Sequence, residues 1–215
     1  MSSLVGKRVL VTGGGRRVGA AIAEALRSAG AVPVVHSNRT VCENGMESVR
    51  MDFLTGTPEQ LLDRCGRLDA IVNNASVFLH AEAAEQMLVN YEFPTRLIRE
   101  FFRRFGSGCA VNMLDSSVKK PAADPYRQSK YLLREATRKM ALEFAPAMRV
   151  NAVALGPVLP PDELAHLGMR RTRGVIPLRR PVELHDAAAA VLFMLENESI
   201  TGAVLDVDCG MGMLS

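Results

Sequence analysis

Short apolar runs alternate along the chain with stretches whose apolar residues recur at helical spacing. Such runs are typical of strands buried on both faces of a parallel sheet, and the stretches between them are typical of the covering helices. Strands are expected over residues 9–12, 32–36, 48–51, 69–72, 109–114, 149–154 and 204–207. Helices are expected over residues 18–28, 81–104 with a bend near Pro94, 126–144 and 182–196, with a small one between residues 52 and 69. This alternation predicts a doubly wound α/β fold with a mostly parallel sheet and helices on both faces.

The chain of 215 residues shows no internal repeat and no low-complexity tract, so we expect one domain over residues 1–215. It contains no apolar run long enough to span a bilayer, and its N-terminus lacks the basic-then-apolar layout of a secretion signal. The four cysteines form no C-x-x-C pair, and the four histidines lack metal-ligand spacing. We therefore expect a cytoplasmic protein without membrane contact, disulfide framework or metal.

The net charge is mildly basic, at +3, and several arginines gather between residues 170 and 180. A solvated loop and helix face explains this cluster, and the alternative is attraction of an anionic substrate or cofactor. Nucleic-acid binding is not expected, because only 5% of the residues are aromatic and no recognition module is present. Residues 157–181 are rich in proline, glycine and arginine, and we expect a mobile substrate loop there.

A glycine-rich turn, residues 12–19, separates the first strand from the first helix. Glycines let backbone N–H groups approach a pyrophosphate, and the N-terminus of the helix favours its negative charge. Such a cluster is often no more than a tight turn, but its placement here predicts dinucleotide binding. The expected contacts are Gly13, Arg16, Arg17, Val18 and Gly19.

The end of the second strand indicates which dinucleotide is bound. Enzymes that use NAD usually place an acidic residue there to hold the ribose hydroxyls. Here the sequence continues with His36, Ser37, Asn38 and Arg39, without an acid. These side chains accommodate a 2′-phosphate, which a carboxylate would repel. We therefore expect NADP(H), and the alternative is that Arg39 merely faces solvent.

Tyr126 and Lys130 stand four residues apart in an expected helix and so share one of its faces. A lysine that stays positive beside a phenol favours the tyrosinate and lowers the pKa of the phenol. A phenol tuned in this way gives or takes a proton near neutral pH. Downstream of a dinucleotide-binding pattern, this pair predicts proton transfer with a substrate.

Over almost its whole length the chain resembles the short-chain dehydrogenase/reductase family. The resemblance is carried, in chain order, by the glycine-rich turn, Asp52, Asn73 with Asn74 and Ala75, Asn90, Tyr126 with Lys130, and residues 151–158. It implies a seven-stranded Rossmann-type sheet of order 3-2-1-4-5-6-7. The active site is expected at the carboxyl ends of the strands, as in other open α/β sheets.

The resemblance also implies roles for these residues. Tyr126 is the proton donor or acceptor, Lys130 lowers its pKa and holds the nicotinamide ribose, and Asn90 supports a water that connects to Lys130. Asp52 meets the adenine. The cofactor cleft is further lined by Asn74, Ala75, Gly156 and Val158. Family members are often tetramers, so the resemblance implies a homotetramer built through the helices of Asn90 and Tyr126 and the C-terminal strand.

Three departures from the family pattern resemble its pteridine reductase branch, and His36 also suits that branch. Arg17 replaces the second glycine of the turn, Asp115 replaces the serine that ends the fifth strand, and Ser76 replaces a glycine, with Phe78 two residues on. Phe78 is expected to stack on a flat pterin. Asp115 is expected to deliver a proton to a ring nitrogen, and Arg17 to contact both the pyrophosphate and the pterin edge.

Each of these assignments has an alternative. In the alternative, Phe78 is a core aromatic and Arg17 contacts only the cofactor. Asp115 then caps the following segment, with Ser116 or Ser117 as the usual serine shifted, because Asp115 is closer to Tyr126 than is usual in the family.

The expected activity is the reduction of a C=N bond of a dihydropteridine, or of dihydrofolate, by NADPH. The cofactor supplies the hydride, and the protein supplies orientation and the proton. One alternative is a carbonyl reductase of the 3-oxoacyl thioester type, which Ser116 and Ser117 keep open. Another is a regulator that senses NADP(H) without chemistry. The presence of Asn90, Tyr126 and Lys130 argues against a pure sensor.

Overall fold

The computed structural model describes residues 3–38, 45–78, 81–158 and 174–214, so Arg39 and most of the expected substrate loop lie outside the described residues. Within them, seven parallel strands form one sheet of order β3-β2-β1-β4-β5-β6-β7. The strands are β1 (Arg8–Val11), β2 (Val32–Ser37), β3 (Glu47–Arg50), β4 (Ala70–Asn73), β5 (Gly108–Asp115), β6 (Met148–Leu155) and β7 (Val204–Val207). The predicted sheet order is confirmed.

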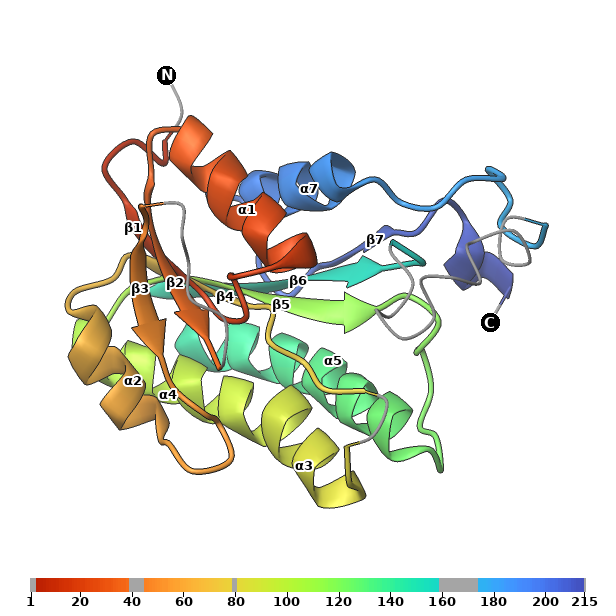
Figure 1. Cartoon of the computed structure of the whole chain (residues 1–215), viewed down its shortest axis with the longest axis horizontal. Helices are drawn as coiled ribbons and strands as arrows, with labels where there is room; N and C mark the ends of the chain where they lie inside the picture. Colours follow the sequence, from red (N-terminus) through yellow and green to blue (C-terminus); the bar gives the residue numbers. More distant parts are fainter. Residues whose placement is uncertain (1–2, 39–44, 79–80, 159–173, 215) are drawn as a thin grey trace.

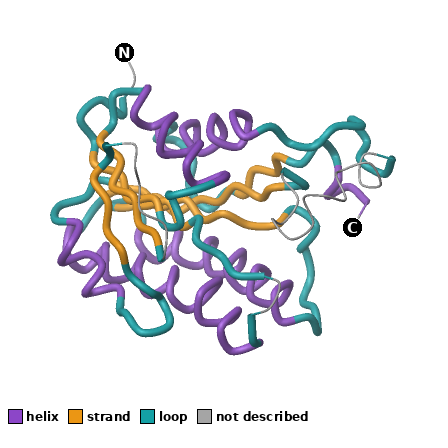
Figure 2. The backbone as a smooth tube through the Cα atoms, viewed as in Figure 1, coloured by secondary structure: helices purple, strands orange, loops and turns teal. Residues whose placement is uncertain are grey.

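Helices cover both faces of the sheet (Figure 1; Figure 2). On one face, α1 (Arg17–Ser28) and α7 (Leu184–Glu196) pack against each other. On the other face lie α2 (Pro58–Cys65), α3 (Ala83–Met87), α4 (Phe93–Phe105) and α5 (Pro125–Phe144). A short 3-10 helix, η3 (Met211–Leu214), follows β7. Among the described residues, no helix is long and apolar enough to cross a membrane.

Successive residues of each strand point to opposite faces of the sheet, which divides the core into two layers. Val9 and Val11 of β1 pack in the layer of α1 and α7, whereas Leu10 between them packs in the layer of α2, α4 and α5. All three side chains are fully buried, and burial of each contributes about 2 kcal/mol. Because both faces are covered, the strands appear in the sequence as continuous apolar runs.

The helix predicted over residues 81–104 is divided into α3, a π-helical turn η1 (Leu88–Glu92) and α4. Pro94 lies in the first turn of α4, where a proline is tolerated, and it has no N–H to donate to the carbonyl of Asn90 four residues earlier. A π turn within a helix is rare and frequently lies at a functional site. The irregularity expected near Pro94 therefore lies just before it and contains Asn90.

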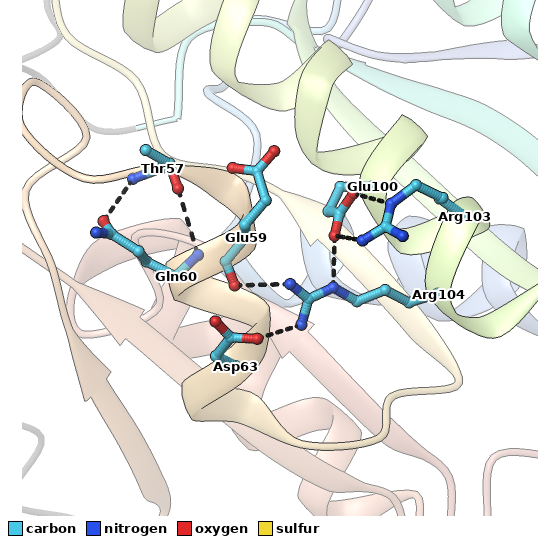
Figure 3. A network of polar contacts seen from close by, with 7 residues as sticks. All are labelled: Thr57, Glu59, Gln60, Asp63, Glu100, Arg103 and Arg104. Carbon is cyan, nitrogen blue, oxygen red and sulfur yellow. Dashed lines mark hydrogen bonds and ion pairs between the residues drawn. The ribbon is translucent and has the colours of Figure 1, made fainter.

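A charged network joins α4 to α2 (Figure 3). The Glu100 carboxylate accepts hydrogen bonds of 2.5–2.6 Å from Arg103 and Arg104. Arg104 also donates to Asp63 at 2.6 Å and to the Glu59 carbonyl at 3.1 Å. The side chain of Glu100 is 8% exposed, and the guanidinium groups of Arg103 and Arg104 lower its pKa to about 2. One buried carboxylate thus anchors two arginines at the junction of these helices.

Buried amide groups connect two neighbouring strands to α5. Asn73 Nδ2 on β4 donates to Asn112 Oδ1 on β5 at 2.9 Å, and Asn112 Nδ2 donates to Thr137 Oγ1 at 2.9 Å. Thr137 in turn donates to the carbonyl of Leu133. Bonded polar groups in a low-dielectric core hold their elements in a defined arrangement. The ends of β4 and β5 are thereby fixed relative to the helix that carries Tyr126.

Candidate active site

A cleft of about 1210 Å³ opens at the carboxyl ends of the strands, with β1 and β4, between which the strand order reverses, at its centre. Open α/β sheets bind ligands at such a switch point. Most of the predicted site residues line it: Gly13, Arg16, Arg17, Val18, Gly19, His36, Ser37, Asn38, Asp52, Asn74, Ala75, Ser76, Phe78, Asp115, Tyr126, Lys130, Gly156 and Val158. Asn90 is buried behind this lining, and Arg39 lies outside the described residues.

The glycine-rich turn is held by Thr12 and Asn74, which follow β1 and β4. Thr12 Oγ1 accepts hydrogen bonds of 3.0 Å from the N–H groups of Asn74 and Ala75, and Asn74 Nδ2 donates to the carbonyls of Thr12 and Gly13. A Cβ on Gly13 would lie 2.9 Å from the Ala75 Cα, and one on Gly19 would lie 2.2 Å from the Gly13 carbonyl oxygen. Glycine is therefore required at both positions. Thr12 was not among the predicted contacts, although it is the first residue of the turn.

Arg17 has a φ of 53°, in the left-handed region that favours glycine. This conformation fits the interpretation that Arg17 stands where related sequences have a glycine, and it costs an arginine roughly 1–2 kcal/mol. Arg17 is the first residue of α1, and both it and Arg16 line the cleft. Two guanidinium groups thus lie at a helix N-terminus, which itself attracts anions. A contact of Arg17 with the substrate stays a prediction.

His36 is 2% exposed, and both of its ring nitrogens bond to the backbone. Nε2 donates to the Met51 carbonyl at 2.9 Å, so Nδ1 accepts the Gly13 N–H at 3.3 Å. The ring stacks on Phe53 at 4.2 Å between centroids, and Phe53 stacks on Phe93 at 3.6 Å. Burial lowers the pKa of His36 to about 4, so the ring is neutral at pH 7. It therefore offers no positive charge to a cofactor phosphate, and instead ties the glycine-rich turn to the segment after β3.

Tyr126 faces Asp115 and Phe78 across the cleft. Its hydroxyl lies near enough to the Asp115 carboxylate for that group to raise the pKa of the phenol, and its ring centroid lies 4.6 Å from that of Phe78, with the rings inclined by 55°. Phe78 is 49% exposed, so the alternative that it is a core aromatic is wrong. An exposed aromatic ring beside a polar pair is a surface on which a flat ligand can stack.

The ionisation of Tyr126 and Lys130 differs from the expectation. Burial raises the pKa of Tyr126 well above its ordinary value, and the Asp115 charge adds to this rise. Lys130 Nζ donates to the Met113 carbonyl at 3.1 Å and lies 5.9 Å from the centre of the Tyr126 ring. Burial lowers the pKa of Lys130 to about 8. The predicted lowering of the Tyr126 pKa by Lys130 is not seen in this structure, where burial and the facing Asp115 carboxylate set the direction of the shift.

Asp115 has two sets of partners. Its Oδ1 accepts the N–H and the hydroxyl of Ser117 at 2.8 and 2.6 Å, so it does cap the following segment. Its carboxylate also acts on Tyr126, whose pKa it raises. Ser116 is fully buried and lines the cleft, and its Oγ has no hydrogen-bond partner among the described residues. Of the three candidates for the serine position, Asp115 is the one that acts on the pKa of Tyr126.

Asn90 lies behind the cleft and uses both ends of its amide group. Oδ1 accepts the Val77 N–H at 2.9 Å and the Ser76 hydroxyl at 3.0 Å. Nδ2 donates to the Val77 carbonyl at 2.9 Å and to Ser129 Oγ at 3.3 Å. Ser129 donates to the Tyr126 carbonyl at 2.7 Å, which links Asn90 to α5. The water that Asn90 is expected to support stays a prediction.

Other parts of the lining come from segments after β3, β6 and β7. Asp52 follows β3, and its Oδ1 accepts the Leu54 N–H at 2.9 Å. Gly156 follows β6, where a Cβ would lie 2.7 Å from the backbone of Asp208. The lining also includes three residues that no motif in the sequence marks: Glu85, Met113 and Met211.

The glycine-rich turn lies at the switch point of a parallel sheet, and the phenol at the start of α5 lies beside the carboxyl group that ends the fifth strand. This arrangement is typical of the site of a Rossmann-type oxidoreductase. A family model described as enoyl-(acyl carrier protein) reductase matches residues 15–212. The chain belongs to the short-chain dehydrogenase/reductase family.

Several curated relatives match nearly the whole chain. The sequence is 31% identical to the granaticin polyketide synthase putative ketoacyl reductase 2 of Streptomyces violaceoruber, over 95% of this chain and 96% of the relative. It is 30% identical to L-xylulose reductase of Bos taurus, over 96% and 97%. It is 26% identical to pteridine reductase 1 of Leishmania tarentolae, over 95% and 96%. These names do not agree on one substrate.

Two similar solved structures come from Brucella. The structure of FolM alternative dihydrofolate reductase 1 from Brucella suis in complex with NADP is 32% identical, with a TM-score of 0.84 over 99% of this chain and 97% of that one. The protein of that name from Brucella canis, complexed with NADP, is also 32% identical, with a TM-score of 0.82 over 98% and 96%.

Proposed function

We propose that the chain is an NADP(H)-dependent reductase that converts a dihydropteridine, or dihydrofolate, to its tetrahydro form. The observation that carries this proposal is the Asp115–Tyr126 pair facing the exposed ring of Phe78. A hydroxyl is suited to hold the oxygen of a ketone, whereas a carboxyl group is suited to protonate a ring nitrogen. The names of the Brucella structures and of the Leishmania relative support the same substrate class.

NADP is the ligand in both Brucella structures, and the residues of this chain fit it. Gly13 and Gly19 leave room for a pyrophosphate at the N-terminus of α1, beside two arginines. Ser37 and Asn38 line the cleft at the end of β2, in a stretch without an acid to repel a 2′-phosphate. When bound, the cofactor supplies the hydride.

The side chains of the cleft supply orientation and the proton. Reduction of a C=N bond adds a hydride to carbon and a proton to nitrogen. The raised pKa of Tyr126 keeps the phenol protonated at neutral pH, so its proton can pass to the ring nitrogen directly or through the Asp115 carboxylate, which gains one proton as it gives one up. Lys130 has a pKa of about 8, so it is mostly positive at neutral pH and offsets the charge of Asp115. The exposed face of the Phe78 ring is a surface on which a flat substrate ring can stack.

The test of this function is NADPH oxidation, followed by absorbance, with several substrates in parallel. Dihydrobiopterin, dihydromonapterin, dihydrofolate, an acetoacetyl thioester and L-xylulose cover the classes that the relatives suggest. We expect turnover of a dihydropteridine or of dihydrofolate. Turnover of the thioester or the sugar alone would contradict the proposal. Tight NADPH binding without oxidation of any substrate would support a sensor instead.

Replacement of Tyr126 by Phe tests the proton donor. We expect kcat to fall by about a hundredfold or more, because the hydroxyl that supplies the proton beside Asp115 is lost. The Kd of NADPH, measured by fluorescence titration, is expected to change little. Tyr131→Phe on the same helix is the matched control and keeps its activity. Full activity in Tyr126→Phe would rule out a role of the phenol in the chemistry.

Reduction of a 3-oxoacyl thioester is the second candidate function, and the hydroxyl of Ser116 favours it. This group is buried, lines the cleft and has no partner within the described part of the chain. A free hydroxyl at this point would suit a carbonyl oxygen. Clean reduction of the acetoacetyl thioester, with every pterin inert, selects this function over the first.

A further inference from the structure

The position of the Phe78 ring depends on how its backbone is held. The side chain is 49% exposed, and among the described residues its ring contacts that of Tyr126. A ring that is half exposed receives little support from packing, so it keeps its place only when its backbone is fixed. Two carboxamide side chains, Gln86 on α3 and Asn90 on η1, make hydrogen bonds to this backbone.

Gln86 spans the segment that follows the ring. Its Nε2 donates to the Phe78 carbonyl at 3.1 Å and to the Ala81 carbonyl at 2.9 Å. Because both partners are carbonyl oxygens, the donor end of the amide must face them. Its Oε1 is buried without a hydrogen-bond partner in the described part of the structure. A buried acceptor without a partner is unfavourable, so the side chain is oriented for its two bonds to this segment.

Asn90 holds the segment that precedes the ring. Its amide makes a reciprocal pair of bonds with the Val77 backbone and continues through Ser129 to the Tyr126 carbonyl. Gln86 and Asn90 are four residues apart on one continuous helical stretch, so they lie on the same side of it. The backbone is therefore held on both sides of Phe78, and it is tied to the turn of α5 that carries Tyr126.

We propose that Gln86 is a positioning residue of this site: together with Asn90, it keeps the Phe78 ring against Tyr126 as a fixed wall for a flat heteroaromatic substrate. The substrate class of this wall rests on the proposed function. The positioning of the ring by Gln86 does not rest on that function, because it follows from hydrogen bonds within the protein. Gln86 itself contacts the backbone of the wall and not the reacting atoms.

A fluorescent reporter tests this role without any ligand. The chain contains no tryptophan, so Phe78→Trp introduces a single one at the wall. In the double variant Phe78→Trp, Gln86→Glu, a carboxylate of the same shape removes the donor and faces two carbonyl oxygens. We expect lower fluorescence anisotropy and stronger quenching by acrylamide than in Phe78→Trp alone. Unchanged anisotropy and quenching would overturn the proposal.

The matched control is Phe78→Trp, Gln60→Glu. It adds the same charge on α2, where Gln60 Oε1 accepts the Thr57 N–H at 3.1 Å and a carboxylate accepts equally well. Its anisotropy is expected to equal that of Phe78→Trp. Hydrogen exchange gives a second measurement without tryptophan: the Ala81 amide, which donates to the Phe78 carbonyl at 3.4 Å in the segment held by Gln86, is expected to exchange faster in Gln86→Glu than in the wild-type chain. Equal exchange rates would contradict the proposal.

Steady-state kinetics separate the two proposals. If both hold, Gln86→Glu raises the KM of the dihydropteridine by up to about tenfold, the value of a good aromatic contact. The KM of NADPH is expected to stay the same, because the contacts of the glycine-rich turn are intact. If the wild-type chain turns over no pteridine while the anisotropy still falls in the double variant, the proposed function fails and the positioning role of Gln86 stands.

Discussion

His36 connects two segments of the site through one uncharged ring. Nδ1 accepts the Gly13 N–H, which a protonated ring cannot do. Burial lowers the pKa of His36 from 6.5 to about 4 in the folded chain. The unfolded chain therefore binds the additional proton first, and the free energy of unfolding falls as the pH drops from about 6.5 to about 4.

Replacement of His36 by Phe keeps a flat ring against Phe53 but removes both hydrogen bonds and the titration. We expect the free energy of unfolding at pH 7 to fall by about 1–3 kcal/mol, because the Gly13 N–H and the Met51 carbonyl lose their partner. The decline between pH 6.5 and 4 is expected to become flatter. Chemical denaturation at several pH values measures both effects, with the exposed His185→Gln as control. An unchanged pH dependence would show that another group titrates.

Some residues of the site could be predicted from the sequence, whereas their ionisation and several of their contacts could not. Tyr126, Lys130 and Asp115 were predicted because they stand at fixed places in the family pattern. The pKa shifts of Tyr126 and Lys130 were not predicted, since they depend on burial and on distances across the fold. Thr12 begins the glycine-rich turn but was given no role, and Gln86 belongs to no motif. Their partners are backbone groups, which every residue has, and those of Thr12 lie 62 and 63 residues further along the chain.

At the scale of elements, the Glu100 network fixes α4 against α2 (Figure 3). Glu100→Gln leaves Arg103 and Arg104 without their carboxylate, and we expect a loss of about 1–3 kcal/mol at pH 7. The pKa of Glu100 is lowered from 4.5 to about 2, so its contribution is complete above about pH 4.5 and declines as the pH falls toward 2. Thermal unfolding of the variant and the wild-type chain at pH 7, 5 and 3.5 measures this difference.

The two curves are expected to differ equally at pH 7 and 5 and to approach each other at pH 3.5. Glu24→Gln is the control, because Glu24 pairs with Arg27 on the surface of α1 and an exposed pair contributes little. A difference that persists unchanged at pH 3.5 would show that the stability of Glu100→Gln is lost for a reason other than charge.

Most elements were predictable because a strand buried on both faces has a distinctive apolar run, and each predicted strand lies within one residue of its expected ends. The π turn η1 could not be predicted from the sequence. Apolar residues such as Val89, Phe93 and Leu97 recur every four residues through this region, so the pattern indicates one continuous helix. The local widening follows from the missing N–H of Pro94 and changes no buried position, which leaves no trace in the hydrophobic pattern.

At the scale of the whole molecule, we propose that the chain assembles as a homotetramer. Leu142 on α5 and Phe193 on α7 are exposed on opposite sides of the sheet. Large apolar side chains on two separate faces suit two different subunit contacts. Sedimentation equilibrium is expected to give the mass of four 23.4 kDa chains, and Leu142→Glu is expected to give a smaller species. A wild-type mass of one chain would contradict the proposal.

The hydrogen bonds of Thr12 with Asn74 and Ala75 join parts of the chain that are far apart in sequence. The floor of the cleft does not exist until β1 and β4 have paired across that separation, a slow kind of event in folding. A dinucleotide that binds only the completed cleft therefore stabilises the folded chain against unfolding. At a hundred times its Kd, such a ligand adds about 2.7 kcal/mol. The lifetime of the folded chain is therefore tied to the cellular supply of its cofactor.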